Sequence, residues 1–279
     1  MTEPIGILAA ELRWREAPDL SSSAFSADEL LDRVRELAGT TVELMDREPG
    51  SGSEGFVFPE IRATFTDGDV PMMVIWALPD GGSASSVPDE AFLHSREWQE
   101  AREVLAGPTF PMLVTDLMGR LVPPAPRLRA WHAVLRAIVE AARPDGIHLV
   151  GSARVIAGDA YLARLDADAT GFGVLLNLRR FSVDRATGES VFDTLGLAPF
   201  GLPDVQVHFL GLDGDAMAQW VWNAAWYLFA NGDVIGDGHT VAGVDPDERW
   251  PCRHEIGLAD PERPVLDVDP SPHGPVRPA

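Results

Sequence analysis

The chain has 279 residues, of which 46% are apolar and 23% charged, values close to those of ordinary globular proteins. Its 43 acidic and 22 basic residues give a formal net charge of −21, which argues against nucleic-acid binding through phosphate contacts. No apolar run reaches the roughly 20 residues of a membrane helix, and the start, MTEPIGILAAELRWRE, lacks the basic head of a signal peptide. We therefore expect a cytoplasmic protein that does not bind membranes.

Strands and helices intermix along the first half of the chain. Strand-like apolar patterns occupy residues 4–14, 41–48, 56–79, 110–119 and 147–156. Helical patterns bounded by caps or breakers occupy residues 26–39, 88–107, 123–146 and 157–166. The clearest helix start is Ser26, with Gly39 as the matching end. The Asp67-Gly68 pair predicts a hairpin inside 56–79.

The second half contains the densest apolar region. A strand pair is predicted at 172–184 and 188–196, followed by a strand over 204–212. A helix begins after Asp213 or Asp215 and ends at Asn231. Its apolar residues form two stripes, so we expect it to be buried on two faces.

The stretch NGDVIGDGHT, residues 231–240, follows that helix and is rich in polar residues. A calcium loop needs oxygen ligands at alternate positions, and Ile235 interrupts that spacing. We interpret Gly232 as the left-handed helix cap, 233–235 as a short strand, and Asp237-Gly238 as a hairpin turn before a returning strand over 239–244.

This order of elements predicts an α+β protein with mixed or antiparallel sheets and packed helices, an order that permits two ferredoxin-like halves. We divide the chain into an N-terminal α+β half over 1–118 and a C-terminal α+β half over 119–244. Residues 245–279 are rich in proline and lack apolar periodicity, so they are interpreted as an extended arm or disordered tail that adds little to the core.

Several catalytic chemistries are excluded or poorly supported. The chain contains no lysine, which excludes P-loop and Schiff-base lysines, and its single cysteine excludes a multi-cysteine metal site. GSGSEG at 50–55 matches a dinucleotide fingerprint, but a strand rather than a helix follows it. No nucleophile elbow occurs, although Ser152 at a strand end leaves a serine hydrolase as a weak alternative.

Among the seven histidines no H-E-x-x-H spacing occurs. Two adjacent strands could still bring His208 and His239 together with Asp204 or Asp237, and Asp233 lies in the same stretch. These five residues form the candidate interaction site, or alternatively the site of a small metal-dependent or serine hydrolase. No catalytic residue, metal ligand or cofactor is assigned.

The motifs DTLGL, FGLPDVQVHF, AAWYLFANGDVI and DGHTVAG, within residues 193–243, are similar to the C-terminal signature of a bacterial family, domain of unknown function 4261. Upstream, FPMLVTDLMG and GIHLVGSARVI are similar in order and spacing to its central region, so the resemblance covers roughly 90–243. The family implies no established activity, cofactor or catalytic residue.

Together these observations favour a non-enzymatic bacterial protein of the cytoplasm, either a protein-binding accessory or an immunity-like factor. The excess of negative charge lies on the surface because buried carboxylates are costly, so we expect a basic protein as partner. The sequence does not fix the oligomeric state.

Overall fold

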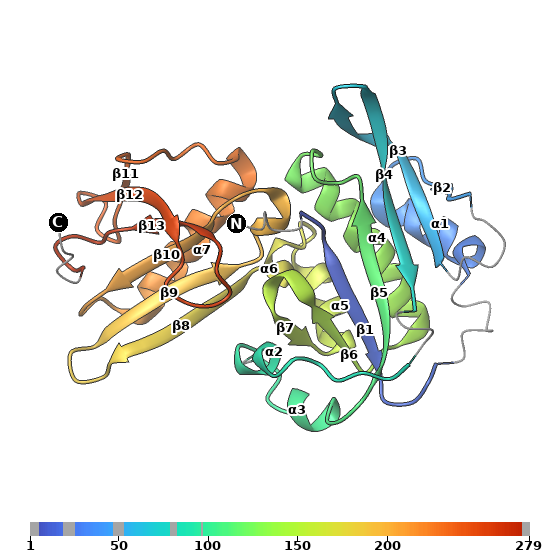
Figure 1. Cartoon of the computed structure of the whole chain (residues 1–279), viewed down its shortest axis with the longest axis horizontal. Coiled ribbons are helices and arrows are strands. Elements are labelled where there is room, and N and C mark those ends of the chain that lie inside the picture. The colour runs from blue at the N-terminus through green and yellow to red at the C-terminus, as the bar shows by residue number, and fades with distance from the viewer. Residues whose placement is uncertain (1–5, 19–25, 47–52, 79–82, 96, 275–279) are drawn as a thin grey trace. The chain divides into compact units, whose positions relative to one another are not determined.

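The computed structural model describes residues 6–18, 26–46, 53–78, 83–95 and 97–274. Of the described residues, 31% are helical and 34% lie in strands, which form two sheets, and this confirms the α+β class. It divides into two compact units, Gly6–Leu175 and the residues from Leu176 onward (Figure 1). This division differs from the expected boundary at 118/119, because the helix and the strands that follow residue 118 pack and pair with the sheet that precedes them.

The N-terminal unit is built on a seven-stranded sheet of order β2-β3-β4-β5-β1-β6-β7, in which every neighbouring pair is antiparallel. Its strands are β1 (Ala9–Trp14), β2 (Glu43–Leu44), β3 (Ser53–Phe65), β4 (Gly68–Ala77), β5 (Phe110–Leu117), β6 (Gly146–Leu149) and β7 (Arg154–Ile156). The predicted hairpin is confirmed, since Phe65 on β3 pairs with Gly68 on β4.

The described helices of this unit are α1 (Ala27–Ala38), α2 (Asp89–Leu93), α3 (Ala101–Val104), α4 (Pro124–Ala142), α5 (Gly158–Ala167) and α6 (Phe172–Leu175). Helix α1 begins as predicted, because the Ser26 hydroxyl accepts a hydrogen bond from the backbone N–H of Glu29. It ends at Gly39, whose φ of +63° is left-handed. Helices α1 and α4 pack together and against β3, and Val34 on α1 and Leu135 on α4 are fully buried.

Strand β1 pairs on either side with β5 and β6, and α4 connects these two strands. Because both are antiparallel to β1, β5 and β6 run in the same direction, so β5, α4 and β6 form a split β-α-β unit. The seven-strand order contains more than the four strands of a ferredoxin-like half, and β1 and β3 run in opposite directions. The finer expectation of two ferredoxin-like halves is therefore wrong.

The C-terminal unit has a six-stranded sheet of order β11-β12-β13-β10-β9-β8. Its elements are β8 (Asn177–Asp184), β9 (Glu189–Leu195), β10 (Asp204–Phe209), α7 (Gly214–Asn231), β11 (Thr240–Ala242), β12 (Arg249–Ile256) and β13 (Pro264–Val268). Strands β10 and β13 are parallel, whereas the other neighbours are antiparallel. The sheet is therefore mixed.

Helix α7 lies on one face of this sheet and contacts β8, β9 and β10. It begins as predicted with Asp213, whose carboxylate accepts a hydrogen bond of 2.9 Å from the backbone N–H of Ala216. Its second apolar stripe, formed by Trp222, Trp226 and Phe229, is only partly buried, since Phe229 is 3% exposed but Trp226 is 40% exposed. A helix that packs on one face of a sheet leaves the edge of such a stripe facing solvent.

The interpretation of residues 245–279 as an arm or disordered tail is wrong for 249–268. Strand β13 lies between β10 and β12, and Val265, Leu266 and Val268 on it are almost fully buried. The pattern is obscured because Pro251 interrupts β12 and Pro264 begins β13, whose parallel partner β10 lies about sixty residues earlier in the sequence. Residues 275–279 lie outside the described part of the chain.

Four shorter elements also differ from their sequence predictions. The helix expected over 88–107 is two short helices, α2 and α3, and the strand expected over 147–156 is the hairpin of β6 and β7, which turns at Val150–Ser152. The strand expected from 172 begins only at Asn177, after α6. Residues 233–235 form no strand, and β11 instead pairs with β12. Within the described ranges, no helix combines the length and apolar character needed to span a bilayer.

Candidate functional site

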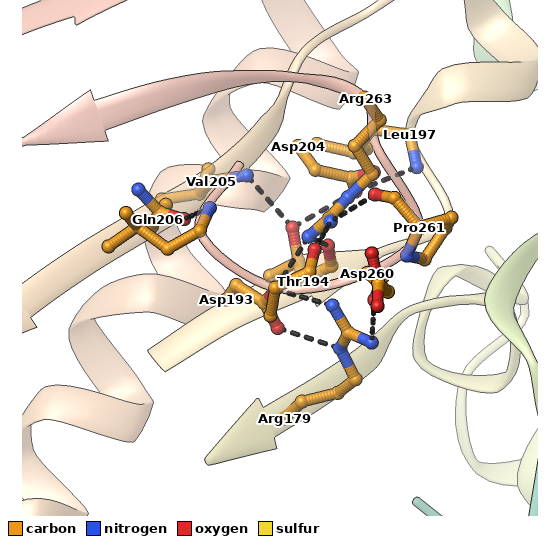
Figure 2. Close-up of polar contacts among 12 residues, drawn as sticks. Arg179, Asp193, Thr194, Leu197, Asp204, Val205, Gln206, Asp260, Pro261 and Arg263 are labelled. Carbon is orange, nitrogen blue, oxygen red and sulfur yellow. Dashed lines mark hydrogen bonds and ion pairs between the residues drawn. The ribbon is translucent and has the colours of Figure 1, made fainter. Parts of the chain in front are cut away.

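Two arginines and two aspartates form a buried ion-pair cluster in the C-terminal unit (Figure 2). The Asp193 carboxylate receives Arg179 Nη2 at 2.5 Å and Arg263 Nη2 at 2.6 Å. Arg263 Nε also lies 3.2 Å from Asp204 Oδ2. The Thr194 hydroxyl donates to Asp204 Oδ1 at 3.1 Å. All four charged side chains are at most 5% exposed.

The sheet register explains why these side chains meet. Directly paired residues form one polar row across five strands, consisting of Arg179, Asp193, Gln206, Asp267 and Arg253. Because successive residues of a strand point to opposite faces, the neighbours of this row face α7. Arg180, for example, lies against Gly214 at the start of α7. The polar row therefore occupies the face of the sheet opposite α7.

The loop between β12 and β13 supplies many of the remaining partners of this row. The backbone N–H of Leu258 donates to Gln206 Oε1 at 2.7 Å, and Arg179 Nη1 donates to the carbonyl oxygen of Asp260 at 2.7 Å. Arg263 donates to carbonyl oxygens of this same loop. The loop between β12 and β13 therefore lies against the polar row. The side chains of the row form their hydrogen bonds with groups of the same chain.

The buried ion-pair cluster has no orphaned side-chain atom. Among the described residues, the buried side-chain nitrogens without a partner are Arg13 Nε and Trp131 Nε1, both in the other unit. Burial raises the pKa of Asp204 to about 6, and the charge of Arg263 opposes that rise. A saturated and almost inaccessible network is suited to fixing strand register rather than to contacting a substrate. Asp204 therefore belongs to the framework of the unit.

His208 and His239 do not meet. His208 lies on β10, where its Nε2 is 2.8 Å from Glu189 Oε1 on β9. His239 directly precedes β11, and β12 and β13 separate β11 from β10. Three strand spacings amount to roughly 14 Å. The expectation that adjacent strands bring these histidines together is wrong, because the sheet order follows pairings that the sequence does not reveal.

Asp233 and Asp237 do converge, on His254 of β12. His254 Nε2 lies 3.0 Å from Asp233 Oδ1, and its Nδ1 lies 2.9 Å from Asp237 Oδ1. The backbone N–H of His254 also donates to Asp237 Oδ1, at 2.7 Å. His239 makes a different contact, since its Nδ1 accepts from the backbone N–H of Gly236 at 3.1 Å. We call Asp233, Asp237 and His254 the histidine clamp.

His254 was missed because it lies in the segment interpreted as an arm. A signal was present: Trp250 and Cys252 are buried and alternate with exposed residues, which is the period of a half-buried strand. Trp250 packs against Trp220 of α7, with ring centroids 5.1 Å apart and the ring planes tilted by 50°. His254 follows Trp250 at the same period and so lies on the α7 side of the sheet.

The solvent-facing side of α7 is the most distinctive surface of this unit. We call it the outer face of α7, and its exposed residues are Asp215, Gln219, Asn223, Trp226, Tyr227, Ala230 and Asn231. Trp226 stacks on Phe229, with ring centroids 5.6 Å apart, and Phe229 packs edge-on against Phe200. The exposed indole is thus supported from below by buried aromatic rings, which holds it at the surface.

The sequence around the outer face of α7 carries negative charge without basic residues. Between Arg185 and Arg249 there is no lysine or arginine. The acids of that stretch are Glu189, Asp193, Asp204, Asp213, Asp215, Asp233, Asp237, Asp245, Asp247 and Glu248. Apart from Asp193 and Asp204, these side chains are exposed or half-buried. The outer face therefore carries exposed aromatic rings within a stretch of the sequence that has acids but no lysine or arginine, while Arg180 of β8 lies at the start of α7.

The N-terminal unit holds its candidate groups in structural contacts. Ser152 is fully buried, and its hydroxyl lies 3.5 Å from the carbonyl oxygen of Leu149, so it is not presented as a nucleophile. Burial raises the pKa of Glu11, but bonds from His148 and Arg13 outweigh burial and bring it to about 2. The fingerprint match at 50–55 begins outside the described residues. Across the described chain, no three or more His, Cys, Asp or Glu side chains are grouped to hold a metal ion.

Residues 193–269 match a family model described as a domain of unknown function (DUF4261). This confirms the resemblance of the C-terminal region, which runs from β9 to the end of β13 and includes the histidine clamp and most of the buried ion-pair cluster. The match extends beyond residue 243 into the segment expected to be a tail, and it does not include residues 90–192. No curated protein matches the chain. No solved structure matches it either.

Proposed function

We propose that the C-terminal unit is a non-enzymatic binding module that receives a cationic segment of a partner protein on the outer face of α7. The observation that carries this proposal is the coincidence of exposed Trp226 and Tyr227 with the stretch that lacks basic residues. An accessory or immunity-like role in the cytoplasm fits such a module.

Arginine and lysine side chains would be recognised here by two effects. A cation over the face of an indole or phenol ring gains about 0.5–1 kcal/mol at an exposed site. The surrounding carboxylates add a long-range attraction that speeds association and weakens as salt screens it. Aromatic rings then provide contact area, while the acids select a cationic partner over a neutral one.

The hydrolase alternative has less support. It needs His208 and His239 to act at one centre, but each has a different partner and three strand spacings separate their positions. Asp204, the third member of that alternative, is 1% exposed and engaged with Arg263 and Thr194. The residues that the hydrolase alternative needs therefore lie at two separate places in the C-terminal unit.

The test is binding of a fluorescently labelled synthetic octa-arginine peptide to the full chain. We expect the Trp226→Ala, Tyr227→Ala double variant to bind about tenfold more weakly at 0.15 M salt, since two cation–π contacts are lost. Phe65→Ala is the matched control, because Phe65 is a 38% exposed aromatic residue in the other unit. Equal affinities of the double variant and the control would contradict the proposal.

Salt dependence provides a second measurement on the same complex. The association rate of the peptide should fall at least several-fold between about 0.05 and 0.5 M salt. Stopped-flow fluorescence on the wild type measures this rate. A rate that is indifferent to salt would mean that the acidic charge serves solubility and not recognition.

A further inference from the structure

The histidine clamp places an imidazole between two carboxylates. Both ring nitrogens of His254 lie within 3.0 Å of a carboxylate oxygen. An ionised carboxylate only accepts hydrogen bonds, so each ring nitrogen must carry a proton to make its contact. The observed geometry is therefore that of an imidazolium, with one positive charge bridging two negative ones.

A neutral imidazole cannot maintain both bonds, because only one of its nitrogens carries a proton. The tautomer protonated at Nδ1 keeps the bond to Asp237, which the backbone N–H of His254 also holds at 2.7 Å. The unprotonated Nε2 then presents a lone pair to Asp233. Loss of the proton therefore releases Asp233 first.

Asp233 is well placed to affect the outer face of α7. It directly follows Gly232, whose backbone N–H donates to the carbonyl oxygen of Leu228 and ends the helix. Tyr227 lies six residues before Asp233, and its carbonyl oxygen accepts from Asn231 Nδ2 at 2.9 Å. The rise of about 1.5 Å per residue puts the end of the helix at Asn231 roughly 6 Å beyond Tyr227 along the axis, and Asp233 follows two residues later.

We propose that the histidine clamp regulates the binding face by pH: protonated His254 neutralises and holds Asp233, and neutral His254 frees its carboxylate for a cationic partner. This inference rests on the function proposed above. Raising the pH through the titration of His254 changes the net charge of the clamp from −1 to −2. A cationic segment should therefore bind more tightly at pH 8 than at pH 6.

The electrostatic surroundings agree with this direction. Partial burial lowers the pKa of His254, but hydrogen bonds and charges from Asp237 and Asp233 outweigh it and leave the pKa above its usual value. On β12 itself, the neighbours Arg253 and Glu255 pair with each other on the opposite side of the strand. On β13, the residue opposite His254 is Leu266, and Asp267 beside it belongs to the polar row on the other face.

The first experiment follows the ring nitrogens of His254 by NMR in the full chain labelled with ¹⁵N-histidine. We expect a pKa above 6.5 and a doubly protonated ring at pH 6, with Nδ1 keeping its proton at pH 8. Asp233→Asn should lower the pKa of His254, whereas Glu189→Gln, which removes the partner of His208, should leave it unchanged. A pKa at or below 6.5, or one insensitive to Asp233→Asn, would overturn the proposal.

The second experiment measures octa-arginine binding at pH 6 and pH 8 for the wild type, His254→Gln and His239→Gln. The wild type and the His239→Gln control should bind a few-fold more tightly at pH 8, while His254→Gln should lose most of that difference. Equal pH dependence in all three proteins would overturn regulation by the clamp. If the Trp226→Ala, Tyr227→Ala double variant bound octa-arginine as tightly as the wild type, the proposed binding face would be refuted. The NMR titration would then still test the histidine clamp by itself.

Discussion

The buried ion-pair cluster and the histidine clamp are both built from aspartates and cations of the C-terminal unit, yet they differ in their access to water. Arg179, Asp193 and Arg263 are at most 5% exposed, whereas the side chain of His254 is 32% exposed and that of Asp237 69%. Burial makes the removal of one partner costly, because the charge left behind has no water to solvate it. Because the histidine clamp is exposed, breaking its ion pairs costs little free energy, and a change of pH can break them.

The largest effect is expected when β13, the strand between the buried ion-pair cluster and the histidine clamp, is removed. Truncation after Asp260 deletes Arg263 and β13, the strand between β10 and β12. We expect the C-terminal unit to lose cooperative unfolding, because two strand pairings and the buried residues of β13 disappear together. Scanning calorimetry measures this, with truncation after Gly274 as the control. A thermal midpoint that shifts only slightly would show that β13 contributes little.

The second prediction breaks the buried ion-pair cluster with one substitution. Arg263→Ala should destabilise the protein by about 3–5 kcal/mol, because Asp193 and Asp204 remain buried with one cation fewer. Urea unfolding followed by tryptophan fluorescence measures the change. Arg249→Ala is the control, since Arg249 is exposed and donates to carbonyl oxygens of its own turn. Similar costs for both variants would contradict the distinction between buried and exposed charges.

Local signals predicted individual elements well, while the site depended on long-range pairings. Ser26, Gly39 and Asp213 act through atoms a few residues away, so their caps could be predicted from sequence. The parallel pairing of β10 with β13 joins residues about sixty positions apart and leaves no local trace. The partner of Asp204 in the cluster, Arg263, therefore cannot be predicted from local patterns, and His208 pairs with Glu189 of β9 rather than with His239.

The third prediction uses pH to separate the two regions. The pKa of Asp204 is raised to about 6, so the folded state holds this proton more tightly than the unfolded state. Its stabilisation is present at low pH and is lost as pH rises from about 4 to about 6, by at most about 3 kcal/mol. Asp204→Asn should remove that part of the slope relative to wild type, measured by urea unfolding at several pH values.

His254 titrates in a different window. Its pKa is also raised, so the stability it contributes is present below pH 6.5 and is lost as pH rises through its folded value. His254→Gln should therefore change the pH dependence of the free energy of unfolding only above pH 6.5. This change should be smaller than the change that Asp204→Asn causes below pH 6.5. If a single variant removed the pH dependence of the unfolding free energy in both pH ranges, Asp204 and His254 would not titrate independently.

The smallest effect is expected at the glycine that connects α7 to the clamp. Gly232 has φ of +83°, a conformation that a β-branched residue adopts only with strain, so Gly232→Val should cost about 1 kcal/mol. Gly236→Val is the matched control, because φ at Gly236 is not positive and an added Cβ would meet only the His239 ring at 3.5 Å. Urea unfolding compares the two variants.

We also expect Gly232→Val to shift the NMR titration of His254, because a changed backbone at residue 232 displaces the Asp233 carboxylate from Nε2 of His254. An unchanged titration beside a clear loss of stability would mean that Asp233 reaches His254 without help from this turn.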